Sequence, residues 1–253
     1  MLYDILKEMD AVKKEEQKFL TMPVRQSGVR DSIYEKVPEK LCTVLETAFS
    51  KAFELVFLHG KQLIEKTYSK EELKMEFAAS NFVIDEAQTR KSFQRMDRGA
   101  QKKNFANHTF TSISGLGMGF LGFGIPDIPV LVATVLRGVY EIALSYGFAY
   151  DTAKEQIYIL RLIRTALAEG EERLECNRLL DLEEETTVKA EIAKTAKLLS
   201  DALLVEKFVQ GIPIVGMVGG FVNHSVYRKI SKLARLKYKK RYLYKKKAEL
   251  KRA

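Results

Sequence analysis

The sequence contains no tryptophan, two cysteines and five prolines among its 253 residues. Cys42 and Cys176 cannot build a disulfide framework, and they share no metal-ligand spacing with His59, His108 or His224. The scarcity of proline and a hydrophobic fraction of 46% exclude a disordered chain. We therefore expect a folded protein without a metal or another cofactor, working in a reducing cytoplasm.

Signals for β-structure and for common catalytic motifs are also missing. Valine and isoleucine recur at helical spacing, and no Asn-Gly or Asp-Gly pair marks a hairpin turn. The sequence has no Gly-x-Ser-x-Gly nucleophile motif and no phosphate-binding Gly-x-x-x-x-Gly-Lys loop. Gly117-x-Gly119-x-x-Gly122 matches a dinucleotide fingerprint in letters only, because no strand precedes it. These absences favour an all-α fold and weigh against an enzyme.

The most informative stretch is residues 113–136, which carry a single charge, Asp127. The stretch is long enough to cross a bilayer. However, Pro126 and Pro129 interrupt it on either side of the acid, and a carboxylate inside a bilayer is costly without a partner. We therefore predict an apolar glycine-rich segment followed by a helix that begins near Asp127. Insertion in a bilayer and burial within the protein are both compatible with this pattern.

Two glycine-rich blocks share a pattern. Gly-Ile-Pro occurs at 124–126 and again at 211–213, and each copy opens an apolar run. A Gly-x-x-x-Gly spacing lies near each copy, and small residues at this spacing let two helix backbones approach closely. We predict that the two blocks are helical and pack against each other through four glycines: Gly115, Gly119, Gly216 and Gly220.

The net charge of +9 is concentrated at the C-terminal end. Residues 227–253 contain 13 Lys or Arg and one acid, Glu249, so this tail carries +12 and the rest of the chain −3. Tyrosine and aliphatic residues recur on one face of the tail, which is typical of a basic amphipathic helix at a membrane surface. The residues predicted to contact an anionic membrane are Arg235, Lys237, Lys239, Lys240, Arg241, Lys245, Lys246 and Lys247. A solvated helix is an alternative, and nucleic-acid binding is disfavoured because no reader motif accompanies the charge.

The remaining chain shows helical periodicity, beginning with an amphipathic helix over 2–20. Residues 69–72 form a capping box, and Asp151 is predicted to cap a helix that Gly170 ends. We expect a single bundle of about six to eight helices. The predicted divisions are an N-terminal helix and connector (1–34), a helical domain (35–226) and a basic C-terminal helix (227–253).

The order of these motifs resembles the EcsC protein family. The resemblance rests on Gly124-Ile-Pro-Asp-Ile-Pro, on Arg137-x-x-x-Glu141 and on the second glycine block from Gly211 to Asn223. It spans the chain from about residue 35 to residue 237. It implies a helical protein of bacterial or related origin, from a family named for the third gene of an operon whose other products form an ABC transporter. It carries over no catalytic residue.

Three charged residues belong to the candidate ligand site: Asp127, Arg137 and Glu141. The site also includes four glycines of the two glycine-rich blocks: Gly115, Gly119, Gly216 and Gly220. Because Arg137 and Glu141 lie four residues apart on one predicted helix, their side chains can pair. One interpretation is a polar site in an apolar cleft that holds a lipid head group. The interpretation that we favour is structural, with Asp127 as a helix cap and the other two as an ion pair.

Together these observations predict a non-enzymatic cytoplasmic protein, peripheral at the inner face of the membrane. We expect it to bind lipid and to accompany an ABC transporter or secretion machinery. A lipid-acting hydrolase is an alternative, and it would depend on Ser112, Ser114 or His224. Nucleic-acid binding through the tail is the other alternative. Salt-sensitive binding to duplex that exceeds binding to anionic vesicles would favour it.

Overall fold

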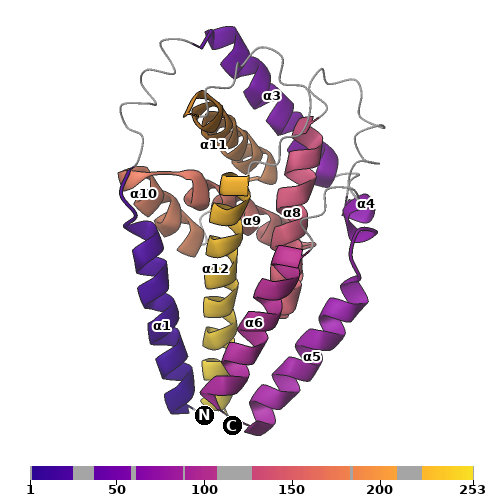
Figure 1. Ribbon diagram of the computed structural model, residues 1–253, viewed down its shortest axis with the longest axis vertical. Helices are drawn as coiled ribbons and strands as arrows, with labels where there is room; N and C mark the ends of the chain where they lie inside the picture. The colour runs from indigo at the N-terminus through magenta and orange to yellow at the C-terminus, as the bar shows by residue number, and fades with distance from the viewer. Residues whose placement is uncertain are drawn as a thin grey trace.

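The computed structural model describes residues 2–24, 37–57, 61–87, 89–106, 127–182, 185–209 and 224–252. Every regular element in these ranges is helical (Figure 1). The helices are α1 (Leu2–Leu20), α3 (Glu39–Leu55), α4 (Lys61–Glu65), α5 (Lys70–Ala87), α6 (Arg90–Ala106), α8 (Asp127–Ser145), α9 (Ala153–Leu167), α10 (Gly170–Asp181), α11 (Val188–Val209) and α12 (His224–Leu250). The all-α prediction is confirmed, and the described ranges alone hold more helices than the six to eight expected.

Helix α12 runs through the middle of the bundle (Figure 1). Its C-terminal part lies among α1, α5 and α6, while α3, α9, α10 and α11 gather in the other half of the molecule. Helix α8 packs beside α12 and also contacts α3, α5 and α6. The two chain termini lie close together at the end of the bundle where α5 also ends, and we call this the terminal end.

The core is built mainly around α8 and α12. Both helices contribute fully buried aromatic side chains, including Tyr140 and Tyr238. The two helices approach closely at Gly138, where an added Cβ would overlap the ring of Tyr227. Gly138 therefore allows α8 and α12 to pack closely.

The three predicted divisions of the chain share one hydrophobic cluster. Ile5 and Val12 of α1 pack in the same cluster as Leu136 of α8 and as Tyr242 and Leu243 of α12. Residues 227–252 thus pack in the same bundle as the other described helices. The physical reason is that the apolar face of α12 finds protein partners.

The predicted cap of α5 is confirmed, whereas the predicted ends of α9 are wrong. The backbone N–H of Glu72 donates to the hydroxyl of Ser69 at 3.2 Å, as the capping box predicted. Helix α9 is capped by Thr152, whose hydroxyl accepts from the N–H of Glu155 at 3.2 Å, and not by Asp151. The same helix ends at Leu167, three residues before Gly170.

Helix α8 begins at Asp127, as predicted. Of the helices that the structure describes, one has the length and composition to cross a membrane, and it is Ile128–Ser145 of α8. This segment is 83% buried within the protein. A core helix of a soluble protein can have the same length and composition. The two glycine blocks, with Gly115, Gly119, Gly216 and Gly220, lie outside the described residues, so their packing stays a prediction.

Candidate functional site

Helix α12 carries all eight residues predicted to contact a membrane, and the structure separates them into three groups. Lys237, Lys239 and Lys246 are buried, with exposed fractions of 1%, 7% and 5%. Three others are partly buried and paired with acids: Arg235, Lys240 and Arg241. Lys245 is exposed and Lys247 partly exposed. The side chains of the first group are therefore enclosed by protein in this structure, and membrane contact by the whole set stays a prediction.

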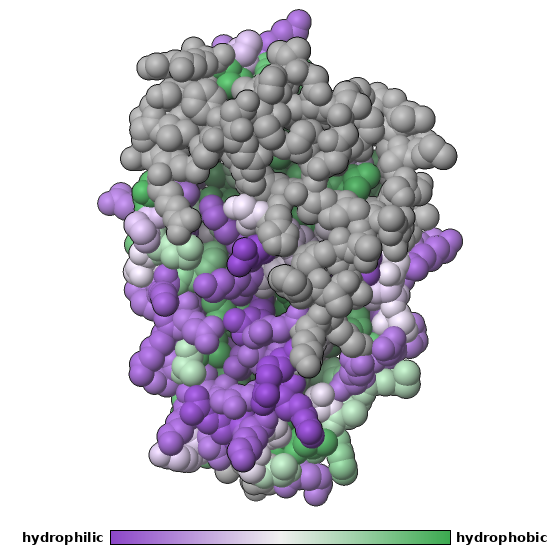
Figure 2. Space-filling view, in the orientation of Figure 1, coloured by the Kyte–Doolittle hydropathy of each residue, from purple (hydrophilic) through white to green (hydrophobic). Residues whose placement is uncertain are grey.

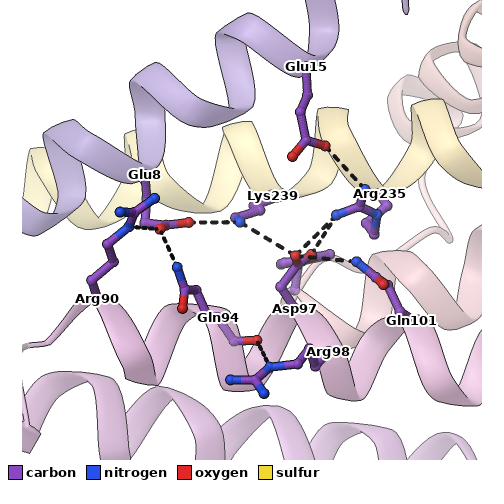
Figure 3. Close-up of polar contacts among 10 residues, drawn as sticks. Glu8, Glu15, Arg90, Gln94, Asp97, Arg98, Gln101, Arg235 and Lys239 are labelled. Atoms are coloured by element: carbon purple, nitrogen blue, oxygen red, sulfur yellow. Dashed lines mark hydrogen bonds and ion pairs between the residues drawn. The ribbon is translucent and has the colours of Figure 1, made fainter.

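Acidic side chains from α1 and α6 neutralise one stretch of α12 (Figure 3). Glu8 of α1 is 2% exposed and accepts from Lys239 at 2.9 Å and from Arg90 at 2.6 Å. Asp97 of α6 lies 3.6 Å from the Lys239 ammonium and 3.0 Å from the Arg235 guanidinium. Lys239 thus bridges two carboxylates from two helices, which orients α12 against both.

The pKa values of these carboxyls are lower than usual. Burial alone would raise the pKa of Glu8, but the hydrogen bonds and charges of Lys239 and Arg90 outweigh it. For Asp97, burial is outweighed by Lys239, Arg235 and a hydrogen bond from the Tyr146 hydroxyl, so its pKa is also lowered. Both carboxyls therefore stay ionised at neutral pH and hold their cations in place.

A cavity of about 710 Å³ lies on the other side of α12, against α9 and the end of α10. Arg241 of α12 forms part of its wall and makes two bonds to Glu155, at 2.6 and 2.9 Å. The same guanidinium lies 4.3 Å from the ring centroids of both Phe148 and Tyr158. Burial would lower the pKa of Arg241, but its contacts with Glu155 raise it instead. Arg241 is therefore a fixed cation at this cavity.

Two lysines of the same wall share two acids. The Lys237 ammonium lies 2.6 Å from Glu16 and 2.8 Å from Asp181. Lys240 lies 2.8 Å from Glu16 and 3.7 Å from Asp181. Burial would lower the pKa of Lys240, but Glu16 and Asp181 raise it. Two ammonium groups therefore lie close together in this part of the cavity, each paired with the same two carboxylates.

The charged residues of the candidate ligand site predicted from the sequence lie away from this cavity. Arg137 and Glu141 are both buried, and the Arg137 guanidinium donates to Glu141 at 2.9 Å, which confirms the predicted pairing. Neither residue lines the cavity beside α12. The side chain of Asp127 is outside the described residues, so its role as a cap or ligand stays a prediction.

Residues named for the hydrolase alternative are not placed. Ser112 and Ser114 precede the described part of the chain at α8, and the side chain of His224 is not described. Within the described ranges, no group of three or more His, Cys, Asp or Glu residues could hold a metal ion. Sequence reasoning also missed the cavity, because Glu155, Asp181 and Arg241 come from three helices and form no local motif.

One protein family matches nearly the whole chain. The model of the EcsC protein family matches residues 4–243. The chain is 23% identical over 210 residues to "Protein EcsC" of Bacillus subtilis (strain 168), and the match covers 82% of this chain and 81% of that protein. No solved structure gives a significant match. Since the family match extends over nearly all described helices, the chain belongs to the EcsC protein family.

Proposed function

We propose that this protein is a non-enzymatic, membrane-associated member of the EcsC family that docks peripherally on anionic bilayers through its terminal end. The observation that carries the proposal is a set of exposed apolar side chains at this end. In the first turns of α1, Leu2, Tyr3 and Leu6 are 48%, 67% and 42% exposed. Near the end of α5, Phe82 and Val83 are 65% and 40% exposed. Such side chains are suited to shallow burial among lipid head groups.

Basic residues surround the same end. The last turns of α12 and the residues after it hold exposed or partly exposed Lys245, Lys247, Lys251 and Arg252. Figure 2 shows mostly hydrophilic residues over the lower half of one face, with hydrophobic residues near its lower edge. A lysine or arginine close to an anionic surface contributes about 1 kcal/mol of attraction, so four suffice for reversible docking. Aromatic rings such as Tyr3 are suited to the head-group layer.

This mechanism differs from the one based on the whole tail. The buried lysines of α12 are paired with acids of α1, α5, α6 and α10 and contribute little field at a bilayer or at a nucleic acid. The exposed fraction of the tail still provides charge complementarity to anionic lipid. We further propose that the docked protein is cytoplasmic, at the inner face of the membrane, and that it accompanies an ABC transporter or secretion machinery. This last part rests on the family resemblance alone.

Cosedimentation with vesicles tests the docking. The triple variant Lys245→Glu, Lys247→Glu and Lys251→Glu should bind anionic vesicles much less than the unaltered chain. The matched control, Lys189→Glu with Lys197→Glu, reverses two exposed lysines of α11 in the other half of the molecule and should bind normally. Salt should release the unaltered protein, because the Debye length falls to about 3 Å at 1 M.

The apolar contribution is tested separately. Phe82→Ser should reduce binding at equal charge, whereas Val44→Ser, at a 46% exposed position of α3, should not. Equal binding to neutral and anionic vesicles, unchanged by salt and by the triple variant, would contradict the docking mechanism. Tighter binding to duplex than to vesicles would favour the nucleic-acid alternative. Deleting residues 227–253 is not a useful test, because the deletion removes a core helix.

A further inference from the structure

The cavity beside α12 carries more positive than negative charge. Its lining includes five basic residues and three acids. Glu16, which lies behind the lining, also pairs with Lys237 and Lys240, so the formal charge of the site is +1 at most. The basic residues are Lys154, Arg161, Lys237, Lys240 and Arg241, and the acids are Glu155, Asp181 and Glu185. An anionic ligand group can therefore bind here where it replaces one of the acids.

The acids of this region differ in how firmly they are held. Glu155 binds Arg241 through both carboxylate oxygens and also accepts from the Tyr238 hydroxyl at 2.7 Å. Glu16 is buried beneath Lys237 and Lys240. Asp181, in contrast, ends α10 and its side chain is 46% exposed. Its carboxylate is the one that an incoming anion can replace, because Glu16 would still compensate part of the lysine charge.

Apart from Thr186, the uncharged part of the wall is aliphatic or aromatic. Ile157 and Tyr158 of α9 face the cavity together with Leu180 and Leu182 near the end of α10. A volume of about 710 Å³ lies within the range that ligand sites usually have, about 300–1,000 Å³. Apolar walls next to fixed cations suit an amphiphile with one anionic end.

We propose that this cavity binds a phosphate-bearing ligand, whose phosphate group takes the place of the Asp181 carboxylate between Lys237 and Lys240. Arg241 lies next to these lysines as a preorganised third cation. The apolar part of the ligand lies along Tyr158, Leu180 and Leu182. A lipid phosphate and a small soluble phosphate share this chemistry. The inference goes beyond membrane docking, since a ligand can occupy the cavity in solution.

Calorimetric titration in the absence of bilayers tests the site. Three probes are compared: a dihexanoyl phosphatidic acid below its micelle concentration, the corresponding phosphatidylcholine, and inorganic phosphate. We expect the phosphatidic acid to bind at least about tenfold more tightly than the phosphatidylcholine, a difference of about 1.4 kcal/mol. If inorganic phosphate binds as tightly as the lipid, the anion site stands and its natural source is a soluble phosphate.

Two substitutions should change the affinity in opposite directions. Asp181→Asn removes the competing carboxylate and should tighten phosphatidic acid binding severalfold. Lys240→Gln removes a cation and should weaken it about tenfold, the loss of one charge-assisted hydrogen bond. Asp10→Asn, which removes an exposed carboxylate of α1, is the matched control and should leave the affinity unchanged.

The unfolding midpoint of each variant shows whether it is folded. Absence of binding by every phosphate probe, or weaker binding by a folded Asp181→Asn variant, would overturn the proposal. Equal affinity for the phosphatidylcholine would overturn it as well. Because no bilayer is present, these results do not depend on whether the terminal end docks on membranes.

Discussion

Helices α8 and α12 lie side by side in the core, yet different interactions stabilise the burial of each helix. Helix α8 is apolar over most of its length, and its one described buried ion pair joins Arg137 and Glu141 within the helix. Helix α12 is rich in lysine and arginine, and its buried cations pair with acids from other helices. Burial of α8 follows from removing apolar surface from water. Burial of α12 also requires that each desolvated charge find a partner.

This difference determines how each helix is specified. Apolar packing tolerates many exchanges of similar volume. A buried ammonium requires a carboxylate at one place, so Lys239 fixes α12 relative to Glu8 of α1 and Asp97 of α6. We infer that α8 supplies most of the stabilising apolar burial and that α12 supplies much of the register between helices. The predictions below test this division.

The largest effect should follow from removing a buried carboxylate that neutralises α12. In Glu8→Leu, the Lys239 ammonium loses its 2.9 Å partner and keeps only Asp97 at 3.6 Å. We expect the free energy of unfolding to fall by about 3–5 kcal/mol, measured by denaturant titration. Glu15→Leu, on the same helix at a side chain that is 55% exposed, is the matched control and should cost less than about 1 kcal/mol.

The double variant Glu8→Leu with Lys239→Met sharpens the same test. It replaces both charges by apolar side chains, and such replacements of buried pairs are often neutral for stability. The double variant should therefore be more stable than Glu8→Leu alone. If the double variant is less stable than the single one, the cost comes from lost packing and not from an unpaired charge.

The second prediction concerns the ion pair of α8. Arg137→Met, Glu141→Gln and the double variant form a thermodynamic cycle. Because the two groups are buried at 2.9 Å, we expect a coupling energy of about 0.5–3 kcal/mol from urea titrations. Additive effects of the two substitutions would show that the groups do not interact, and α8 would then depend on apolar contacts alone.

The comparison also shows what could be predicted from the sequence. Two features of α8 were predictable from local signals. The apolar run and the proline positions predicted the start at Asp127, and the i, i+4 spacing predicted the pairing of Arg137 with Glu141. The all-α class followed from helical periodicity in the same way. These signals act within one helix and need no knowledge of neighbours.

The location of α12 was not predictable by the same reasoning. A basic amphipathic helix at a membrane and a basic helix neutralised by acids of other helices have the same local pattern. The acids that decide between them, Glu8, Glu16 and Asp97, are more than a hundred residues away from their partners in α12. The cavity was missed for the same reason, since its charges come from separate helices.

A smaller effect is expected where the two helices touch. In Gly138→Ala, the added methyl group would overlap the ring of Tyr227 and force α8 and α12 apart. Overpacking of this kind costs about 1–3 kcal/mol, and a lowered unfolding midpoint would show it. Gly99→Ala is the control, because a Cβ at Gly99 would meet no atom within 4 Å and α6 gains a better helix former. Equal effects of the two substitutions would contradict close contact at Gly138.

The smallest effect is a selective response to acid. Asp97 has a folded-state pKa below its ordinary value of 3.8 because Lys239, Arg235 and Tyr146 together outweigh the effect of burial. A depressed pKa contributes stability that is fully present above the unfolded-state value and is lost as the pH falls through the folded-state value. The same sign holds for Glu8, whose ordinary pKa is 4.5.

Denaturant titrations from about pH 7 to about pH 3 measure the difference in unfolding free energy between the unaltered chain and Asp97→Asn. This gap should stay nearly constant down to the ordinary carboxyl range and shrink below it. Glu71→Gln, at an exposed position of α5, is the control substitution. A gap that widens on acidification would mean that Asp97 is protonated in the folded protein, and the ion network that holds α12 would need a different explanation.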